Sequence, residues 1–332
     1  MAPMGIRLSP LGMAVFCLLG VGVIYHLYAG ILTFLLSSCV CRQRKKVDLR
    51  DLLAVSVEAA QLGGEEVKRV RKENTLNEKS KGETKEGAKE LLTMGDLQSH
   101  RKMYNLIKNT FPEITVYSEE SDSKPDSVSW SRNIPDGILK LEKGREVSAD
   151  SITVWIDPLD ATQEYTEKLV KYVTTMVCVA LEGKPVIGYA LWMYFLIFKK
   201  SSYNLNSPKV IVSRSHSGEV KNFLHSAFGN STTIIPAGGA GYKVLSLLKM
   251  HSGQTEPIDE ADVYIHITVI KKWDICAGAA LLNALGGHMT TLKGENIDFS
   301  GTPLNEGGLV ASVEVDHKNI LAKLPNWDLS KH

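Results

Sequence analysis

The sequence predicts a layered α+β body that follows one membrane-spanning helix. Strand-like and helix-like segments are mixed along the chain without strict alternation, which favours an α+β architecture. A long apolar stretch precedes the first amphipathic segment. With 332 residues, of which 44% are hydrophobic, the chain can bury a sizeable core as one large domain or two.

The charge balance limits the kinds of partner. Lys and Arg together number 38 and Asp and Glu 37, which gives a net charge of +1. A chain without a strong positive excess offers no broad surface for a phosphate backbone, so we expect no nucleic-acid partner. A small phosphorylated metabolite remains compatible with this balance.

The amino-terminal stretch predicts a membrane anchor at residues 11–36, after a short tail at 1–10. No Asp, Glu, Lys or Arg lies between Arg7 and Arg42, and the apolar run exceeds the roughly 20 residues that a helix needs to span hydrocarbon. A cleaved signal peptide is the alternative, but its apolar region is usually only about 7–15 residues long. A juxtamembrane linker at 37–47 then leads to a body at 48–332, with sub-lobes expected at 48–205 and 206–332.

Two signals disagree about the side of the membrane on which the body lies. The basic run at 42–46 favours a cytoplasmic body. The sequon that begins at Asn230 carries an N-linked sugar only if the body is lumenal. The residues alone leave both orientations open.

The elements of the body follow from periodicity and from breaking residues. Apolar residues recur at helical spacing after residue 47, so a first helix is expected there. The charged run at 78–90 is typical of a solvated hairpin tip, with a mobile lid as the alternative. A helix that ends before Pro112 and a strand at 114–120 follow. We then expect strands at 152–156, 173–181 and 210–212, and helices at 242–249 and 275–285.

The stretch SITVWIDPLDAT, residues 151–162, predicts a cation site at the end of a strand. Pro158 has no backbone N–H, so we expect the strand to end at Asp157, with Asp160 on the turn that follows. Carboxylate oxygens suit Mg²⁺, and the carbonyl of Leu159 could add a ligand. Thr162 stands where the next helix begins. The alternative is that both acids only form the turn and cap the helix.

Further acids and a glycine-rich turn support the cation site. Glu119 ends a strand, Asp96 lies in the turn TMGD, and Asp274 precedes a helix in KKWD. Each has a structural alternative as a strand-end charge, a turn residue or a helix cap. The turn PAGGAGYK, residues 236–243, suits a close approach of phosphate to the backbone.

The order GD, EE, WIDPLDAT, GGAGYK and KKWD resembles the lithium-sensitive, magnesium-dependent phosphomonoesterases that include inositol monophosphatase. Within that family, the motif SRSHSG at 213–218 and the paired lysines before WD are similar to the bisphosphate 3′-nucleotidase branch, and the anchor and sequon to its Golgi members. The resemblance implies an αβαβα sandwich behind a transmembrane helix, and a single-pass Golgi protein with a lumenal body. A homodimer is compatible with it.

The resemblance also implies roles for individual residues. Two or more Mg²⁺ ions would be held by five ligands: Glu119, Asp157, the Leu159 carbonyl, Asp160 and Asp274. Asp96 and Thr162 would activate the attacking water. The nucleotide would contact four residues: Ser213, His216, Gly239 and Lys243.

The segment at 189–200, YALWMYFLIFKK, departs from the family pattern. Family members continue here with a strand, a proline-containing turn and a returning strand. We therefore expect part of a central hairpin to be missing and the segment to form one poorly accommodated strand. Ten apolar residues at 189–198 are too few for a second membrane span.

We expect the chain to remove the 3′-phosphate of adenosine 3′,5′-bisphosphate, giving AMP and phosphate, and thereby to support sulfation. One alternative is an inositol monophosphatase. An alternative of another class is an inactive anchored isoform that acts, if at all, as a binding protein.

Overall fold

The computed structural model describes most of the body and a little of the amino terminus. The described residues are 10, 21–29, 45–83, 87, 89–122, 124–141, 144–191, 196–198, 207–214, 217–251 and 258–327. Residues Lys46–His332 form one compact unit. Among the described residues, no helix combines the length and apolar character of a membrane span. Of the anchor predicted at 11–36, only residues 21–29 are described, and they are helical. The anchor therefore stays a prediction.

Two long helices form the first layer of the body. α2 (Leu49–Glu73) and α3 (Met94–Thr110) confirm the predicted helices. The carboxylate of Asp48 accepts from the backbone N–H of Arg50 at the start of α2, and a Thr93–Asp96 capping box begins α3. Between the helices, the predicted charged hairpin is β2 (Lys79–Glu83) paired with β3 (Lys89–Leu92).

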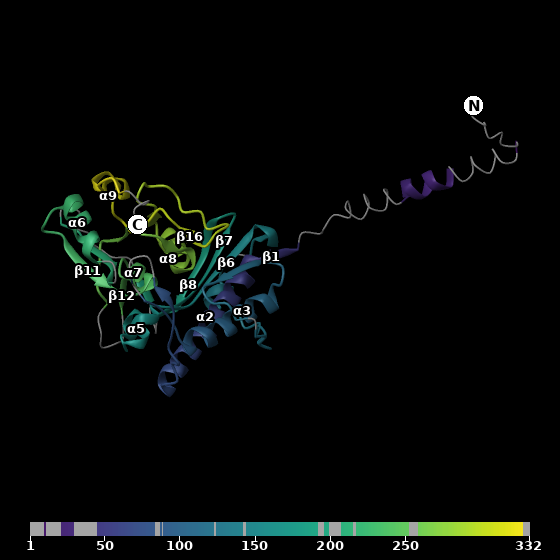
Figure 1. Cartoon of the computed structure of the whole chain (residues 1–332), viewed down its shortest axis with the longest axis horizontal. Coiled ribbons are helices and arrows are strands. Elements are labelled where there is room, and N and C mark those ends of the chain that lie inside the picture. Colours follow the sequence, from purple (N-terminus) through teal and green to yellow (C-terminus); the bar gives the residue numbers. More distant parts are fainter. Residues whose placement is uncertain are drawn as a thin grey trace, which may run out of the picture. The chain divides into compact units, whose positions relative to one another are not determined.

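The first sheet contains four strands in the order β4-β6-β7-β8. Their bounds are Thr115–Ser118, Ile152–Asp160, Thr174–Leu181 and Lys184–Leu191. β4 runs parallel to β6, and the other neighbours are antiparallel. In Figure 1, α2 and α3 lie on one face of this sheet and α8 (Lys272–Ala284) on the other. Both faces of β7 are therefore buried.

Strand β6 is longer than predicted, because it passes through Pro158 instead of ending at Asp157. Its pairing with β7 shifts register between Asp157 and Asp160, where the missing N–H of proline interrupts the ladder. The irregularity keeps both acids at the same end of the sheet.

The second sheet has five strands in the order β11-β10-β13-β17-β15. Their bounds are Thr233–Ala237, Lys209–Ser213, Val263–His266, Leu309–Ser312 and His288–Thr290. Residues of α7 (Ala240–Leu245) and α8 share a core with its inner face. Residues of α6 (Ser217–Phe228) and α9 (His317–Lys323) share a core with its outer face. The helix predicted at 242–249 is thus shorter and starts earlier.

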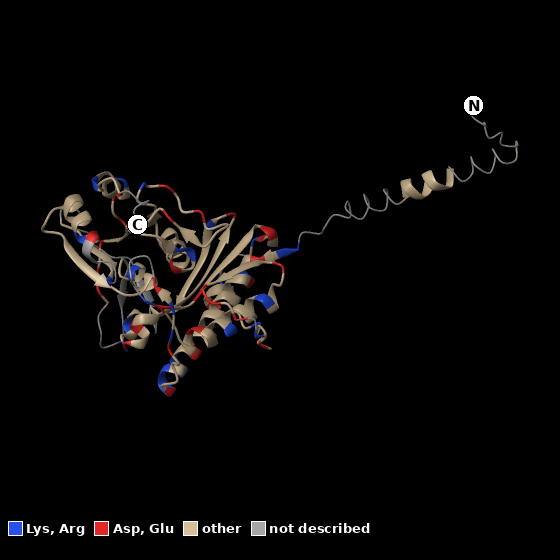
Figure 2. Ribbon diagram, in the orientation of Figure 1, with Lys and Arg blue, Asp and Glu red and all other residues tan. Residues whose placement is uncertain are grey.

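These layers confirm the αβαβα arrangement. One core joins α2 and α3 to the first sheet, a second joins both sheets around α7 and α8, and a third lies under α6 and α9. Acidic and basic residues are interspersed over the described body (Figure 2). The remaining elements are β1 (Lys46–Asp48), α4 (Asp136–Leu139), β5 (Glu146–Ser148), η1 (Ala149–Ser151), α5 (Thr162–Thr166), η2 (Val170–Tyr172), β9 (Leu196–Phe198), β12 (Lys249–His251), β14 (Ile270–Lys271) and β16 (Leu304–Asn305).

The described part of the segment at 189–200 divides between two sheets. Residues 189–191 complete β8 and pair with β7. β9 pairs antiparallel with β12 in a separate two-stranded sheet. Residues 192–195 and 199–200 lie outside the described residues. The expectation of one strand in the central sheet is therefore wrong for β9.

A disulfide between Cys178 and Cys276 joins the first sheet to α8. Cys178 lies on β7 and Cys276 on α8, and both side chains are buried. The two cysteines are 98 residues apart, and nothing in the sequence pattern predicted their pairing.

Candidate active site

A cavity of about 290 Å³ opens where β6, β10, α7 and α8 meet. Many of the predicted site residues line it. They are Glu119, Asp157, Leu159, Asp160, Thr162, Ser213, Gly239, Lys243 and Asp274. Asp96 does not line the cavity and lies buried behind Thr162.

Three carboxylates form the acidic centre of this cavity. Glu119 follows β4, Asp157 lies on β6, and Asp274 is the third residue of α8. Because β4 and β6 are parallel neighbours, their carboxyl ends meet at one edge of the sheet. One oxygen from each of the three carboxylates lies within 4.8 Å of the other two.

Burial and mutual repulsion disfavour negative charge on this cluster when no cation compensates it. Asp157 is 1% exposed, and burial raises its pKa well above the usual range, with the charges of Glu119, Asp160 and Asp274 adding to the shift. Its Oδ1 accepts from the N–H of Leu159 at 3.1 Å. Its Oδ2 is buried without a hydrogen-bond partner among the described residues. Such a set of oxygens fits a hard divalent cation.

Lys81, on β2, neutralises one side of the cluster. Its Nζ lies 2.8 Å from Glu119 Oε1 and 2.6 Å from Glu120 Oε1. Burial still raises the pKa of Glu120 to about 7. Sequence reasoning missed Lys81, because it stands among several lysines in the charged run at 78–90.

Asp160 lies outside the three-carboxylate cluster and contacts α7. Its Oδ1 accepts from the N–H of Ala240 at 3.0 Å, and its Oδ2 accepts from the N–H of Gly241 at 2.8 Å. The hydroxyl of Thr174 also donates to Oδ2, at 3.1 Å. Burial raises the pKa of Asp160 to about 6 despite the nearby Lys243 charge. Asp160 therefore positions the start of α7 whatever else it binds.

Asp96 and Thr162 come together as a hydrogen-bonded pair. Thr162 Oγ1 lies 2.9 Å from Asp96 Oδ1 and 3.1 Å from the Leu159 carbonyl. Asp96 Oδ2 accepts from the backbone N–H and the hydroxyl of Thr93, each at 2.6 Å. Burial raises the pKa of Asp96 to about 6. The carboxylate is thus fixed in place and is more basic than an exposed aspartate.

The glycine-rich turn brings the backbone close to the acids. Gly239 has φ +61°, and a Cβ at this position would lie 2.5 Å from the carbonyl oxygen of Tyr172. Only glycine suits both the conformation and the space. The turn places Lys243 in the cavity wall, where it is 4% exposed and where burial lowers its pKa.

Three predicted residues remain to be placed. Ser213 ends β10, half-buried, at the cavity. His216 lies outside the described residues. Asn230 is exposed in the turn after α6, away from the cavity lining.

Arg214 was not singled out from the sequence although it lies in the SRSHSG motif. Its guanidinium Nη2 lies 2.6 Å from Glu167 Oε2, and its Nε lies 3.3 Å from Glu164 Oε1. Both Arg214 and Glu164 line the cavity. These two ion pairs join the end of β10 to α5 beside the cavity, a long-range contact that spacing alone cannot show.

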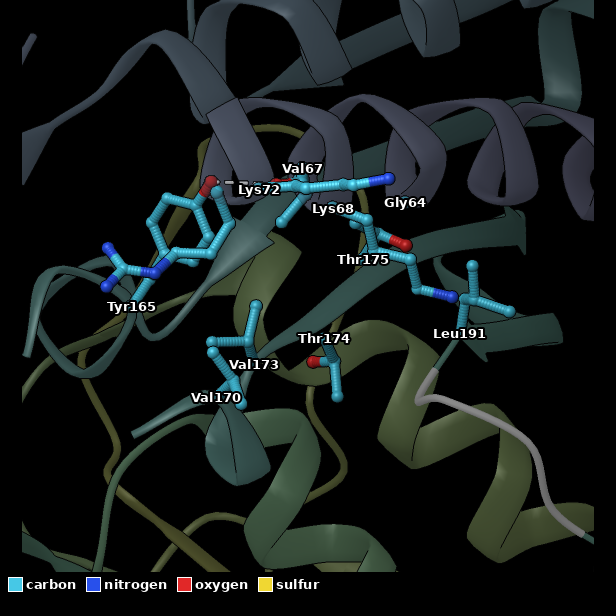
Figure 3. A pocket seen from close by; sticks show the side chains of 11 residues that line it. Gly64, Val67, Lys68, Lys72, Tyr165, Val170, Val173, Thr174, Thr175 and Leu191 are labelled. Atoms are coloured by element: carbon cyan, nitrogen blue, oxygen red, sulfur yellow. Dashed lines mark hydrogen bonds between the residues drawn. The ribbon is translucent and has the colours of Figure 1, made fainter. Parts of the chain in front are cut away.

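A second cavity, of about 280 Å³, lies between α2, α5, the start of β7 and the end of β8 (Figure 3). No acidic side chain is present among its described lining residues. Its hydroxyls are paired, because Tyr165 donates to the Val67 carbonyl at 2.7 Å and Thr174 donates to Asp160. Lys68, Arg71 and Lys72 also line this cavity. Without a carboxylate among the described lining residues it offers no ligands for a divalent cation, so the acidic cavity is the candidate active site.

Comparison with known proteins decides the family. A model of the inositol monophosphatase family matches residues 48–328. The chain belongs to the inositol monophosphatase family. It is therefore a phosphoric monoester hydrolase, and enzymes of this family use divalent metal ions, which agrees with the carboxylate cluster.

Two groups of full-length relatives carry different names. Inositol monophosphatase 3 of Danio rerio is 61% identical over 345 aligned residues, which cover 100% of both chains. Golgi-resident adenosine 3′,5′-bisphosphate 3′-phosphatase of Homo sapiens is 52% identical over 361, again covering 100% of both. Both alignments are longer than the 332 residues of this chain. Each relative therefore contains residues that this chain lacks.

Solved structures agree on the fold. The extragenic suppressor protein SuhB of Bartonella henselae matches 83% of this chain and 99% of its own, with a TM-score of 0.59 and 16% identity. At this identity the likeness concerns the inositol monophosphatase fold alone.

Proposed function

We propose that this phosphatase uses Mg²⁺ to remove the 3′-phosphate of adenosine 3′,5′-bisphosphate, giving adenosine 5′-phosphate and inorganic phosphate. The observation that supports it best is the acidic cavity itself. In it the cluster of Glu119, Asp157 and Asp274 lies beside the Asp96–Thr162 pair and the buried cation of Lys243.

The metal ions would be held by the carboxylates of the cluster. Glu119, Asp157 and Asp274 would supply most ligands, with the Asp160 carboxylate and the Leu159 carbonyl as further ones. When bound, two or more Mg²⁺ ions make water more acidic and stabilise charge on the leaving oxygen. The unpaired Oδ2 of Asp157 is a lone-pair donor left available for this purpose.

The Asp96–Thr162 pair would orient the attacking water. The Thr162 hydroxyl donates its proton to Asp96 Oδ1, so its lone pairs can accept from a water in the cavity. As that water attacks phosphorus, its proton passes to Thr162 Oγ1 and the Thr162 proton passes to Asp96 Oδ1. A pKa of about 6 makes Asp96 a suitable acceptor near neutral pH.

Substrate choice would rest on groups other than the carboxylates. Adenosine bisphosphate carries a base and a second anion that inositol 1-phosphate lacks, and these groups need polar partners to offset desolvation. Ser213, Gly239 and Lys243 line the cavity, and His216 belongs to the same motif as Ser213. The name of the Danio rerio relative supports inositol monophosphate as the second candidate substrate.

Phosphate release tests the two candidates. With Mg²⁺, we expect kcat/KM for adenosine 3′,5′-bisphosphate to exceed that for inositol 1-phosphate, and chelation of the metal or added Li⁺ to reduce both rates. Equal or better turnover of inositol 1-phosphate would favour the second candidate. No turnover of either ester would support the inactive isoform.

We further propose a single-pass Golgi protein, attached through residues 11–36, with its body in the lumen. The Homo sapiens relative is named as Golgi-resident. The Cys178–Cys276 disulfide suits an oxidising compartment, and Asn230 is exposed. Expressed in animal cells, the chain should lose mass on treatment with an N-glycosidase, and Asn230→Gln should abolish that loss. Digestion of the body by protease outside sealed vesicles would contradict this orientation. A homodimer also stays a proposal.

A further inference from the structure

Tyr264, whose hydroxyl forms no hydrogen bond with the described residues, lies in the wall of the candidate active site. Its side chain is 0% exposed, yet it lines the acidic cavity. The neighbours Val263 and Ile265 on β13 belong to the outer core, so the alternation of the strand turns Tyr264 inward toward α8 and the cavity. Its hydroxyl has no hydrogen-bond partner among the described residues.

Two other buried tyrosines of the body, Tyr242 and Tyr165, pair their hydroxyls. Tyr242 Oη donates to Asp259 Oδ2 at 2.8 Å and accepts from the Asp259 N–H at 3.1 Å. Tyr165 Oη donates to the Val67 carbonyl at 2.7 Å. An unpaired buried hydroxyl costs stability, and phenylalanine would fill the same space without that cost. The presence of tyrosine at position 264 therefore indicates that its hydroxyl forms a hydrogen bond with a bound ligand.

The surroundings of Tyr264 favour an anionic acceptor. The Nζ of Lys243 lies 5.5 Å from the centre of the Tyr264 ring, and both residues line the cavity. Burial, with the charges of Asp160 and Asp274, raises the pKa of Tyr264 well above its usual range. The hydroxyl therefore keeps its proton and remains a donor. Beside a buried ammonium, such a donor suits a phosphate oxygen.

We propose that Tyr264 is a substrate-binding residue, whose hydroxyl donates a hydrogen bond to a phosphate oxygen of the ester in the acidic cavity. This inference rests on the proposed function and adds a binding group to the same site.

The test compares Tyr264→Phe with Tyr242→Phe. Without ligand and with chelator present, we expect Tyr264→Phe to melt roughly 2–4 °C above the wild type, because an unpaired hydroxyl has been removed. Tyr242→Phe should melt lower, because it loses paired bonds. The probe is inorganic phosphate added to the Mg²⁺-loaded protein. The rise in Tm that phosphate causes should be smaller in Tyr264→Phe than in the wild type, whereas Mg²⁺ alone should raise both equally.

Kinetics supply the second readout. KM for adenosine 3′,5′-bisphosphate should rise about tenfold in Tyr264→Phe, with a smaller change in kcat and no such rise in Tyr242→Phe. An unchanged or lower Tm without ligand would overturn the inference, because the hydroxyl would then already have a partner. The inference would also be overturned if phosphate raised the Tm of Tyr264→Phe and of the wild type equally. The same holds if the substitution reduced only the rise in Tm that Mg²⁺ causes. If the wild type hydrolyses neither ester, the proposed function fails, while the melting comparison still decides whether Tyr264 binds phosphate.

Discussion

At the scale of single residues, the site concentrates negative charge where water is scarce. Asp157 and Asp274 both have a pKa raised well above the usual range by burial and by neighbouring carboxylates. The metal-free body therefore contains a destabilising cluster that a bound cation would relieve. Removing one of these charges should therefore stabilise the metal-free body and weaken its binding of the metal.

Asp157→Asn tests this opposition. The substitution keeps the shape of the side chain and removes one charge, so the Tm of the metal-free body should rise while Mg²⁺ raises it less than in the wild type. Phosphatase activity should fall on the order of 10²-fold or more. The exposed Asp150→Asn is the matched control and should change neither quantity. An Asp157→Asn enzyme with near wild-type activity under saturating Mg²⁺ would show that the cluster is not the metal site.

His317 gives the body a pH dependence that is separate from the active site. Its ring nitrogens lie 2.9 Å from Thr290 Oγ1 and 2.8 Å from Ser312 Oγ, and burial lowers its pKa to about 4. The unfolded chain binds this proton near pH 6.5, as does a free histidine. The free energy of unfolding should therefore fall as pH drops from about 6.5 to about 4, by on the order of 1–2 kcal/mol after solvent screening.

Urea unfolding of the metal-free protein at pH 7.5 and pH 5 measures the His317 effect. The difference between the two pH values should be larger for the wild type than for His317→Gln, which cannot take up the proton. The same difference in both proteins would mean that other groups cause the acid sensitivity.

Part of the site could be predicted from single residues. The DPLDAT motif places Asp157 and Thr162 at the cavity, because it spans the last residues of β6 and the start of α5, and both are local features. The contact of Asp160 with α7 joins residues that are 80 apart in the chain. The unpaired hydroxyl of Tyr264 depends on how several elements pack around β13. No local pattern contains that information.

At the scale of elements, the disulfide holds together two parts of the site. Cys178 lies on β7, which also carries Thr174, a hydrogen-bond donor to Asp160. Cys276 lies on α8, two residues after Asp274. The bond therefore fixes the helix that presents one candidate metal ligand against the strand that supports another.

Replacing both cysteines by alanine tests the role of the bond. A disulfide that closes a loop of this length stabilises a protein by typically 2–4 kcal/mol, so the double variant should melt several degrees lower. It should also need more Mg²⁺ for half-maximal activity. Reductant under unfolding conditions should lower the Tm of the wild type toward that of the variant and leave the variant unchanged. Free thiols at both positions in the purified, unreduced protein would contradict the assignment.

Helices are the elements that the sequence predicts best. α2 and α3 follow from apolar spacing and a proline stop, because these signals act within one element. The extension of β6 through Pro158 depends on pairing with β7, and the shortening of α7 depends on β12 starting at Lys249. Partners from elsewhere in the chain decide such boundaries.

At the scale of the whole molecule, the three largest hydrophobic cores among the described residues stack in one compact body. The four-stranded and the five-stranded sheet are each covered by helices on both faces, and the acidic cavity lies where these two sheets approach α7 and α8. Mixed elements predict the α+β class, and the family resemblance supplies the layer order. The pairing of β9 with β12 could not be predicted, because three residues of β9 carry no signal for a partner about 50 residues away.

One measurement tests the central claim most directly. The wild-type body is given equal concentrations of adenosine 3′,5′-bisphosphate and inositol 1-phosphate with Mg²⁺, and the products are followed by phosphorus NMR. We predict that the 3′-phosphate signal of the nucleotide disappears first, that adenosine 5′-phosphate and inorganic phosphate accumulate, and that inositol 1-phosphate is largely retained. Earlier loss of inositol 1-phosphate, or accumulation of adenosine 3′-phosphate, would contradict the proposed activity.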